Sequence, residues 1–410
     1  MLKTSQFTFM LCTSIFFMQC ASNPTESDNI PIRDLTMAEK SLVQSDNRFG
    51  FKLFKKIVEA EADKNIFISP LSVSMALGMT LNGANGATQE AMEHALELAG
   101  MSTEEINKAY KSLIELLTQL DPKVIFQIAN SIWYRDSWTF EQEFIDLNKT
   151  YFNALVQGMD FNDPNSVDII NAWVEDNTNG KIETIIKQID PETVMFLINA
   201  IYFKGTWTYE FDEDLTQDDW FTLPDGAKKS CKMMMQTGEF DYLENDDFQA
   251  IDLPYGDGEF RMTILLPKPE KNIDSLIEQF NEENWNSWLD SFSADSVTLQ
   301  LPKFTLEYEI TMNDVLKALG MEIAFTGAAD FTRMYKPGGL FVSYVKHKTF
   351  VEVNEEGTEA AAVTVIGMTD SASGPDIKFM RIDRPFVFMI RENHTETILF
   401  IGKIVEPTLS

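Results

Sequence analysis

Apolar residues follow helical and strand spacings in turn from about residue 46 to the C-terminus. In segment 46–62 they lie three or four positions apart, which predicts an amphipathic helix. Segments 124–134 and 194–203 are long, apolar and nearly free of charged side chains, which is typical of strands in the middle of a sheet. The mixture of the two spacings predicts an α+β protein.

Segment 71–82 is apolar on nearly all sides and follows Pro70, so we expect a helix buried beneath a sheet. No repeat and no Gly/Ser-rich linker interrupts the pattern, which predicts one domain over residues 46–410. The other predicted helices are 87–98, 102–120 and 165–178. The other predicted strands are 65–70, 249–253, 261–266, 296–301, 349–353, 386–391 and 397–405.

The first 45 residues have a different pattern. Residues 1–19 hold one lysine and a short apolar run broken by Thr and Ser, which indicates a secretory signal rather than a membrane span. Cys20 follows, and its surroundings resemble a bacterial lipoprotein signal, in which Cys20 would become the lipidated first residue. The alternative is an ordinary cleaved signal with an incidental cysteine. Residues 20–45 would form a polar tether.

The residues offer little support for catalysis. Apart from Cys20, the cysteines are Cys12 in the signal and Cys231, which we expect to be a small buried residue; no disulfide framework can be built. The histidines, at positions 94, 347 and 394, lie in no zinc-binding pattern, and no nucleophile elbow or phosphate-loop motif occurs. We therefore expect no catalytic residue, metal or cofactor. A hydrolase with a hidden carboxylate pair is the weaker alternative.

The charge narrows the choice of partner. The chain has 33 basic and 64 acidic residues, a net charge of −31. Such a field repels nucleic acid and anionic membranes, so we expect no nucleic acid partner and membrane contact only through a lipid on Cys20. Segment 102–120 holds two lysines against three glutamates, so we expect no polyanion-binding helix.

Residues 353–375 are the most informative stretch of the chain. The predicted strand 349–353 leads into one glycine and three alanines, a strand-like segment at 363–366 and a polar, turn-rich tract up to Pro375. Small side chains with β-compatible neighbours describe a segment that can enter a sheet without steric clash. Gly357 is the natural hinge for such a movement.

This stretch resembles the reactive-loop hinge of the serpins, the serine protease inhibitors that insert a loop into a sheet. Four more segments resemble serpin motifs in the family's order: 65–72, 199–207, 384–388 and 400–407. The resemblance covers nearly the whole domain. It implies the serpin fold, an α+β architecture with three β-sheets, about nine helices and an exposed reactive-centre loop.

The resemblance also assigns roles to individual residues. Trp207 matches the aromatic residue at the top of the main sheet, and Lys303 matches a lysine that pairs with Glu355. An exposed ion pair worth less than ~1 kcal/mol is the alternative for these two residues. The residues that match the polar cluster where the central strands part are Ser69, Ser72, Asn199 and His347. The residues that match the loop hinge are Glu355, Gly357, Thr358, Glu359, Ala360, Ala361 and Ala362.

The function implied is irreversible, suicide-substrate inhibition of a serine protease by a monomer. A protease cleaves the loop, which then inserts as a strand and holds the protease in a covalent complex. From Thr358 onward the alternate residues that would turn inward are small or apolar, and none is charged. This pattern favours inhibition over the alternative, the binding, carrier or storage role of non-inhibitory serpins. The inhibitor would be lipid-anchored to the bacterial outer membrane or cell surface, or secreted.

The family's spacing places the reactive bond sixteen residues after Glu355, between Ser371 and Ala372. Met368, Thr369 and Asp370 are the alternatives. No Arg or Lys occurs between residues 355 and 377, so a trypsin-like pocket finds no suitable side chain. Elastase-like, subtilisin-like and chymotrypsin-like proteases are the expected targets.

Overall fold

The computed structural model describes residues 33–358 and 377–408. The lipidation candidate Cys20, the hinge residues from Glu359 onward and every candidate for the reactive bond lie outside these ranges. Within them, no helix is both long and apolar enough to cross a bilayer. Buried Cys231 confirms the prediction made for that residue.

The described residues form nine α-helices and three sheets, which confirms the predicted α+β architecture. The helices are α1 (Met37–Ala60), α2 (Pro70–Leu81), α3 (Gly86–Ala95), α4 (Thr103–Leu117), α5 (Gln142–Phe152), α6 (Asn165–Asn177), α7 (Ile273–Ile277), α8 (Glu282–Leu289) and α9 (Asn313–Leu316). Three short turns of other helix types are η1 (Glu213–Leu215), η2 (Lys317–Met321) and η3 (Glu322–Phe325).

The largest sheet has nine strands in the order β1-β15-β14-β8-β7-β6-β9-β13, with β5 paired to β6. Its members are β1 (Ile66–Ile68), β5 (Gln217–Thr222), β6 (Lys228–Glu244), β7 (Phe248–Tyr255), β8 (Phe260–Pro267), β9 (Ser293–Pro302), β13 (Lys378–Arg381), β14 (Phe386–Glu392) and β15 (Ile398–Ile404). Strands β14 and β15 are buried at every position, as their almost continuous apolar sequences require.

Two smaller sheets lie side by side and carry the features that matter for function. The four-stranded sheet has the order β12-β4-β2-β3, with β2 (Val124–Arg135), β3 (Leu155–Met159), β4 (Met195–Thr206) and β12 (Gly357–Thr358). The two-stranded sheet consists of β10 (Phe304–Thr311) and β11 (Lys346–Val353). Among the described residues, β4 and β11 share no strand ladder, although both line the same cavities.

The start of the domain differs from the sequence prediction. Helix α1 begins at Met37 rather than at residue 46, so residues 37–45 of the predicted tether are helical. Thr36 and Glu39 form a capping box, in which each side chain accepts a hydrogen bond from the other residue's backbone N–H. The polar residues of this segment suggested a linker, but Glu39 and Ser45 are buried against the rest of the fold.

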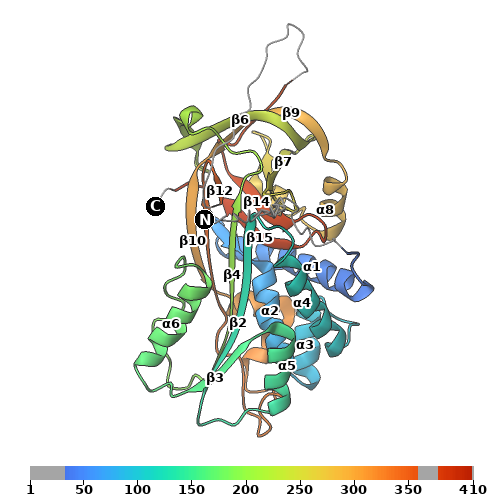
Figure 1. Ribbon diagram of the computed structural model, residues 1–410, viewed down its shortest axis with the longest axis vertical. Helices are drawn as coiled ribbons and strands as arrows, with labels where there is room; N and C mark the ends of the chain where they lie inside the picture. Colours follow the sequence, from blue (N-terminus) through green and yellow to red (C-terminus); the bar gives the residue numbers. More distant parts are fainter. Residues whose placement is uncertain (1–32, 359–376, 409–410) are drawn as a thin grey trace, which may run out of the picture. The chain divides into compact units, whose positions relative to one another are not determined.

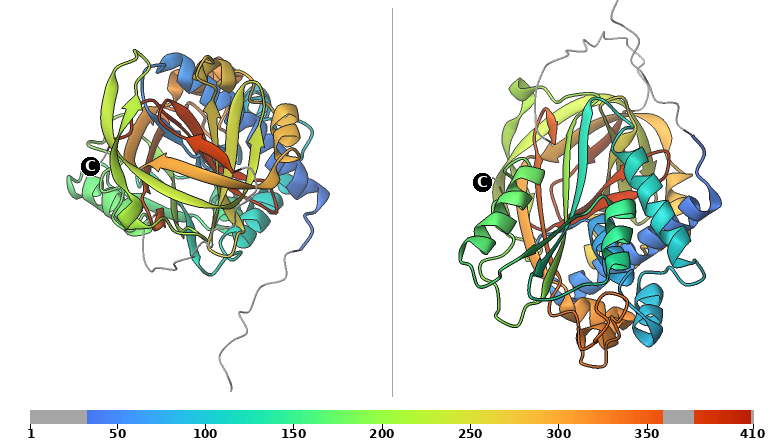
Figure 2. Two further views of the ribbon diagram at one scale, coloured as in Figure 1. Left: turned by 90° about the horizontal axis from the view of Figure 1, so that it is seen from above. Right: turned by 60° about the horizontal axis from the view of Figure 1, so that its bottom comes forward.

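Helix α2 is buried, as its apolar sequence predicts, and contacts β4 and β15. Helix α6 contacts β2 and β4 as well, and its apolar residues belong to a cluster separate from the main core. Figures 1 and 2 show α6 on one side of these two long strands and α2, α4 and α5 on the other. The four-stranded sheet is therefore covered on both faces, by the main core on one and by α6 on the other.

Candidate functional site

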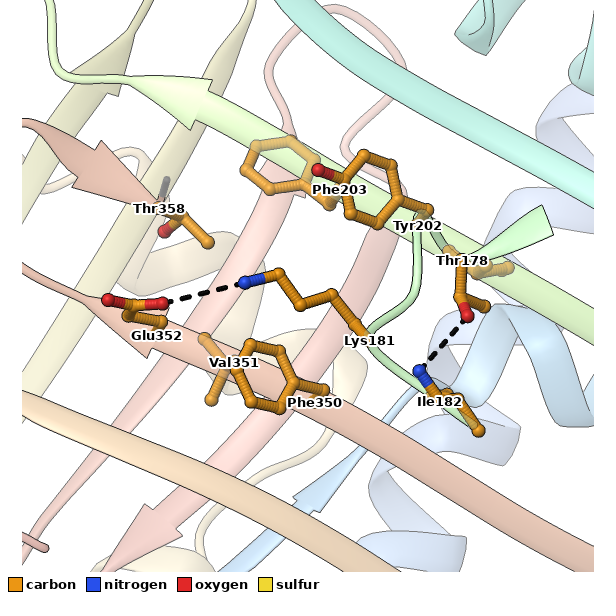
Figure 3. Close-up of a pocket in the computed structure, with 10 residues that line it drawn as sticks. Thr178, Lys181, Ile182, Tyr202, Phe203, Phe350, Val351, Glu352 and Thr358 are labelled. Carbon is orange, nitrogen blue, oxygen red and sulfur yellow. Dashed lines mark hydrogen bonds and ion pairs between the residues drawn. The ribbon is translucent and has the colours of Figure 1, made fainter. Parts of the chain in front are cut away.

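The open space between β4 and β11 is the central feature of the site, and we call it the slot. Its upper part is a cavity of about 20 Å³ lined by Tyr202 and Phe203 of β4 and by Phe350 and Glu352 of β11 (Figure 3). Its lower part is a cavity of about 100 Å³, lined by residues 195–200 of β4 and by the start of β11. Together the two cavities run along most of β4 and β11, and β12 closes the slot at its upper end.

Strand β12 is the stem of the predicted loop, and it already pairs with β4. Gly357 and Thr358 are antiparallel to β4, opposite Thr206 and Gly205. Gly357 has a φ of 142°, and a Cβ atom there would lie 2.2 Å from the carbonyl oxygen of Gly205. Only glycine fits this position, because both the backbone conformation and the close approach exclude a side chain. The hinge glycine singled out in the sequence thus lies where the chain turns into the slot.

Aromatic stacking fixes the entrance beside the stem. The rings of Trp207 and Tyr255 are stacked, with centroids 4.3 Å apart and 14° between their planes. Trp207 donates from its indole N–H to the carbonyl oxygen of Asn354 at 3.0 Å. The hydroxyl of Tyr255 is hydrogen-bonded to that of Thr358 at 2.8 Å, and Thr358 is only 5% exposed. The first inward-facing residue of the loop is therefore already seated in the sheet's interior.

Glu355 holds the other side of the stem. Its carboxylate pairs with Lys303 at 2.5 Å and accepts a hydrogen bond from the hydroxyl of Thr216 at 2.7 Å. Burial by itself would raise the pKa of Glu355, but these two partners outweigh it and lower the pKa below its ordinary value. The Glu355 side chain is 6% exposed, so the alternative of a solvent-exposed ion pair is wrong.

His347 occupies a buried position near the lower part of the slot. Its Nε2 accepts a hydrogen bond from the backbone N–H of Ser69 at 3.0 Å, and Ser69 in turn caps helix α2 by accepting from the N–H of Ser72. Burial lowers the pKa of His347 to about 4, so the ring is neutral at pH 7. A neutral ring is what the Ser69 bond requires, since a protonated Nε2 cannot accept.

Asn199 lies on the opposite wall of the same cavity, which Ser72 and His347 also line. The amide of Asn199 donates to Asn130 of β2 at 2.7 Å, while its carbonyl oxygen is buried and has no hydrogen-bond partner. An acceptor left unsatisfied in a buried cavity carries a free-energy cost that a new donor would remove. The cluster is thus ready to accept a further polar group between β4 and β11.

The structure brings the sequence-derived residues together in two places. Glu355, Gly357, Thr358, Trp207 and Lys303 surround the stem. The four residues of the polar cluster, Ser69, Ser72, Asn199 and His347, meet at the lower cavity.

Sequence reasoning missed three partners of these residues. A lone buried Asn in an apolar strand is a signal that identifies Asn130. Tyr255 and Thr216 carry no such signal, because they reach the stem only through tertiary folding.

No cluster of three or more His, Cys, Asp or Glu suited to a metal ion occurs in the part of the chain that the structure describes. The polar groups that line the slot are hydroxyls, amides, a neutral imidazole and the charged side chains of Lys181, Lys346, Lys348 and Glu352.

Comparison with known proteins agrees with this geometry. Residues 44–407 match the family model described as "Serpin (serine protease inhibitor)". The chain belongs to the serpin family. It is 34% identical to human neuroserpin over 368 residues, which is 87% of this chain and 89% of that protein.

Two solved serpin structures share the fold. The thermophilic serpin tengpin in its native state is 32% identical, with a TM-score of 0.82 over 91% of this chain and 95% of that one. Human thyroxine-binding globulin, solved in complex with its ligand, is 28% identical, with a TM-score of 0.83 over 91% of this chain and 100% of that one. The structural neighbours thus include a serpin in its native state and a protein solved with a bound small molecule.

We predict that acid loosens this serpin through His347. The unfolded imidazole has a pKa near 6.5 and the folded one about 4, so the unfolded state takes up the proton first. Stability is therefore complete above about pH 6.5 and is lost as the pH falls towards 4, by up to about 3 kcal/mol. His347→Gln, which retains an acceptor for Ser69, should flatten the dependence of the thermal midpoint on pH between 7 and 4.

The matched control is His94→Gln, because His94 is exposed on α3. This variant should keep the wild-type pH dependence. An unchanged pH profile in His347→Gln would show that the acid sensitivity, if any, arises elsewhere.

Proposed function

We propose that this serpin is an irreversible, suicide-substrate inhibitor of serine proteases. The observation that carries the proposal is the seating of Gly357 and Thr358 beside β4 at the upper end of an otherwise open slot. The chain that follows Thr358 would continue in the same register into this space once the side chains that narrow it move aside. Neither the slot nor the stem holds groups arranged for catalysis.

The proposed chemistry belongs to the protease. Its serine hydroxyl attacks the carbonyl carbon of the reactive bond. The C–N bond breaks, and the amine of the C-terminal segment is the leaving group. The loop is now joined to the protease through an ester. Water would hydrolyse this ester in an ordinary substrate, but the freed loop inserts into the slot, carries the protease with it and distorts its catalytic centre. The protease is trapped when insertion is faster than hydrolysis of the ester, and it is released when insertion is slower.

The free energy for loop insertion comes from the new contacts that the inserted strand makes with the rest of the fold. Filling the slot pairs backbone groups along β4 and β11 and places small side chains between two covered faces. Each new backbone hydrogen bond contributes about 0.5–1.5 kcal/mol, so a strand of several residues releases several times that amount. The intact form is held away from this state by a kinetic barrier.

A carrier or other binding role is the second candidate, because thyroxine-binding globulin is a structural neighbour. The composition of the loop argues against it for this chain. Thr358 is neutral and buried, and the following inward positions in the alternation are Ala360, Ala362, Thr364 and Ile366. All are uncharged, so their burial carries no ionic desolvation penalty.

A covalent complex that resists denaturant should form with an elastase-like, subtilisin-like or chymotrypsin-like protease, and the cleaved serpin should melt well above the intact form. Thr358→Arg should convert the inhibitor into a substrate. Thr358 is already buried beside Tyr255, so a guanidinium there costs several kcal/mol, displaces the stem from β4 and deprives insertion of its starting position. We expect at least a tenfold rise in the number of inhibitor molecules cleaved for each protease trapped, read from denaturing gels.

The matched control is Glu359→Arg, since the alternation directs position 359 away from the interior. It should retain most of the trapping. Cleavage that leaves the melting temperature of the wild type unchanged would rule out insertion and favour the binding role.

The reactive bond is proposed to be Ser371–Ala372, with Met368, Thr369 and Asp370 as alternative residues before the bond. Mass spectrometry of the released C-terminal peptide tests this directly. A peptide that begins at Ala372, or at any of residues 369–371, supports the assignment. Efficient trapping of trypsin, or a peptide that begins elsewhere, contradicts it.

We also propose that the serpin is exported and anchored by a lipid on Cys20. The mature chain should then begin at an acylated Cys20 and partition into detergent, and Cys20→Ser should abolish that partitioning. A mature N-terminus at another residue, without added lipid mass, would exclude the anchor and leave the inhibitory function unaffected.

A further inference from the structure

A short segment after α6 lies across the upper slot and contacts both strands between which the loop would insert. Residues 178–186, which we call the strap, connect α6 towards β4 and pass over the face of the slot. Figure 3 shows the Lys181 side chain extended from this segment towards Glu352, between the rings of β4 and those of β11. The strap therefore touches both strands that a new strand would have to join.

The strap is fastened firmly to α6. The hydroxyl of Thr178 donates to the carbonyl of Val174 and accepts from the N–H of Ile182 at 3.1 Å. The side chain of Asn171 accepts from the N–H groups of Ile185 and Ile186 and donates to the carbonyl of Ile186. Strap and helix are thus one rigid unit that moves together.

Apolar contacts attach this unit to the β4 side of the slot. Ile182 and Ile186 belong to the cluster formed by α6 with Phe196 and Ile198 of β4. This cluster is separate from the main core. The unit therefore packs on the outer face of the sheet, apart from the packing beneath it.

Polar contacts attach the strap to the β11 side. The ammonium group of Lys181 lies 3.7 Å from a carboxylate oxygen of Glu352 and 4.9 Å from the ring centroid of Phe350. Lys348 of β11 donates to the carbonyl of Thr184 at 3.1 Å, and it also pairs with Glu307 within its own two-stranded sheet. The Lys181 contacts lie beside the stem, because Thr358 lines the same cavity.

The space beneath Lys181 is too small for a strand. The cavity measures about 20 Å³, which is room for roughly one water molecule. Side chains of an entering strand on this face would need the volume that the Lys181 methylenes and the Phe350 ring now occupy. The strap must therefore lift from β11 before the loop can pass.

We propose that Lys181 is a positioning residue that sets the rate of loop insertion by holding the strap to β11 through Glu352 and Phe350. The proposal rests on the inhibitory function proposed above. Release of Lys181 is part of the barrier that keeps the intact serpin from filling its own slot. The same contact sets how often a bound protease escapes before it is trapped.

The test is Lys181→Met, which retains the apolar stem over Phe350 and removes the charge. A half-exposed ion pair and a cation–π contact of this kind together correspond to a rate change of about two- to tenfold. After loop cleavage by a non-target protease, insertion followed by stopped-flow fluorescence should be faster than in the wild type by that factor. Fewer inhibitor molecules should be cleaved per trapped protease, and the intact variant should lose activity sooner on warming.

The matched control is Lys187→Met, an exposed lysine just beyond the strap, which should leave all three measurements unchanged. Glu352→Gln removes the ion pair but leaves the contact of Lys181 with Phe350, so it should accelerate insertion by less than Lys181→Met. The double variant should be no faster than Lys181→Met alone, because both substitutions remove the same ion pair. If Lys181→Met inserts its loop at the wild-type rate, or if the two lysine variants show equal effects, the proposal for Lys181 is wrong and the proposed inhibitory function stands. A wild-type protein that does not insert its cleaved loop at all would overturn the proposed function and this proposal together.

Discussion

The rest of this structure depends on two facing strand edges that are not joined. Strands β4 and β11 each pair on one side, with β2 and β10, and among the described residues β12 is the only strand in the space between them, at its upper end. Backbone N–H and C=O groups are obligatory hydrogen-bonding groups, so an incompletely paired pair of edges is a source of free energy. In the proposed mechanism the missing strand is the reactive loop, which follows the stem in the same chain.

The contacts around the stem hold the upper end of the slot in one arrangement. Gly357 allows the chain to turn against Gly205, and the Trp207–Tyr255 stack forms the wall on which Thr358 is seated. The Lys303–Glu355 pair and the Thr216 hydroxyl fix the residue just before the turn, and together they lower the pKa of Glu355 in spite of its burial. In the proposed mechanism the loop therefore starts its movement from one defined position of the stem.

The lower slot and the strap are the two places where the proposed insertion requires a change of contacts. His347 and Asn199 line its walls, and the unpaired oxygen of Asn199 offers a place for a new donor. A polar cluster of this kind retains strand register while its hydrogen bonds are exchanged, which an apolar cluster could not do. Above it, α6 and the strap pack on β2 and β4 through a small apolar cluster that is separate from the main core.

The sequence by itself determined the fold class, and it singled out Gly357 and the residues of the polar cluster, because each depends on local chemistry or on a motif that is continuous in the chain. The glycine at position 357, the apolar helix after Pro70 and the polar residues 69, 72, 199 and 347 are of this kind. The true start of α1 was misread, since polar residues that suggested a tether are buried by other elements. Only the tertiary structure decided that Glu355 is buried, that Tyr255 and Thr216 complete the stem, and that Lys181 spans the slot to Glu352. These contacts join residues distant in sequence, and no local spacing encodes which distant side chain a folded chain brings within a few ångströms.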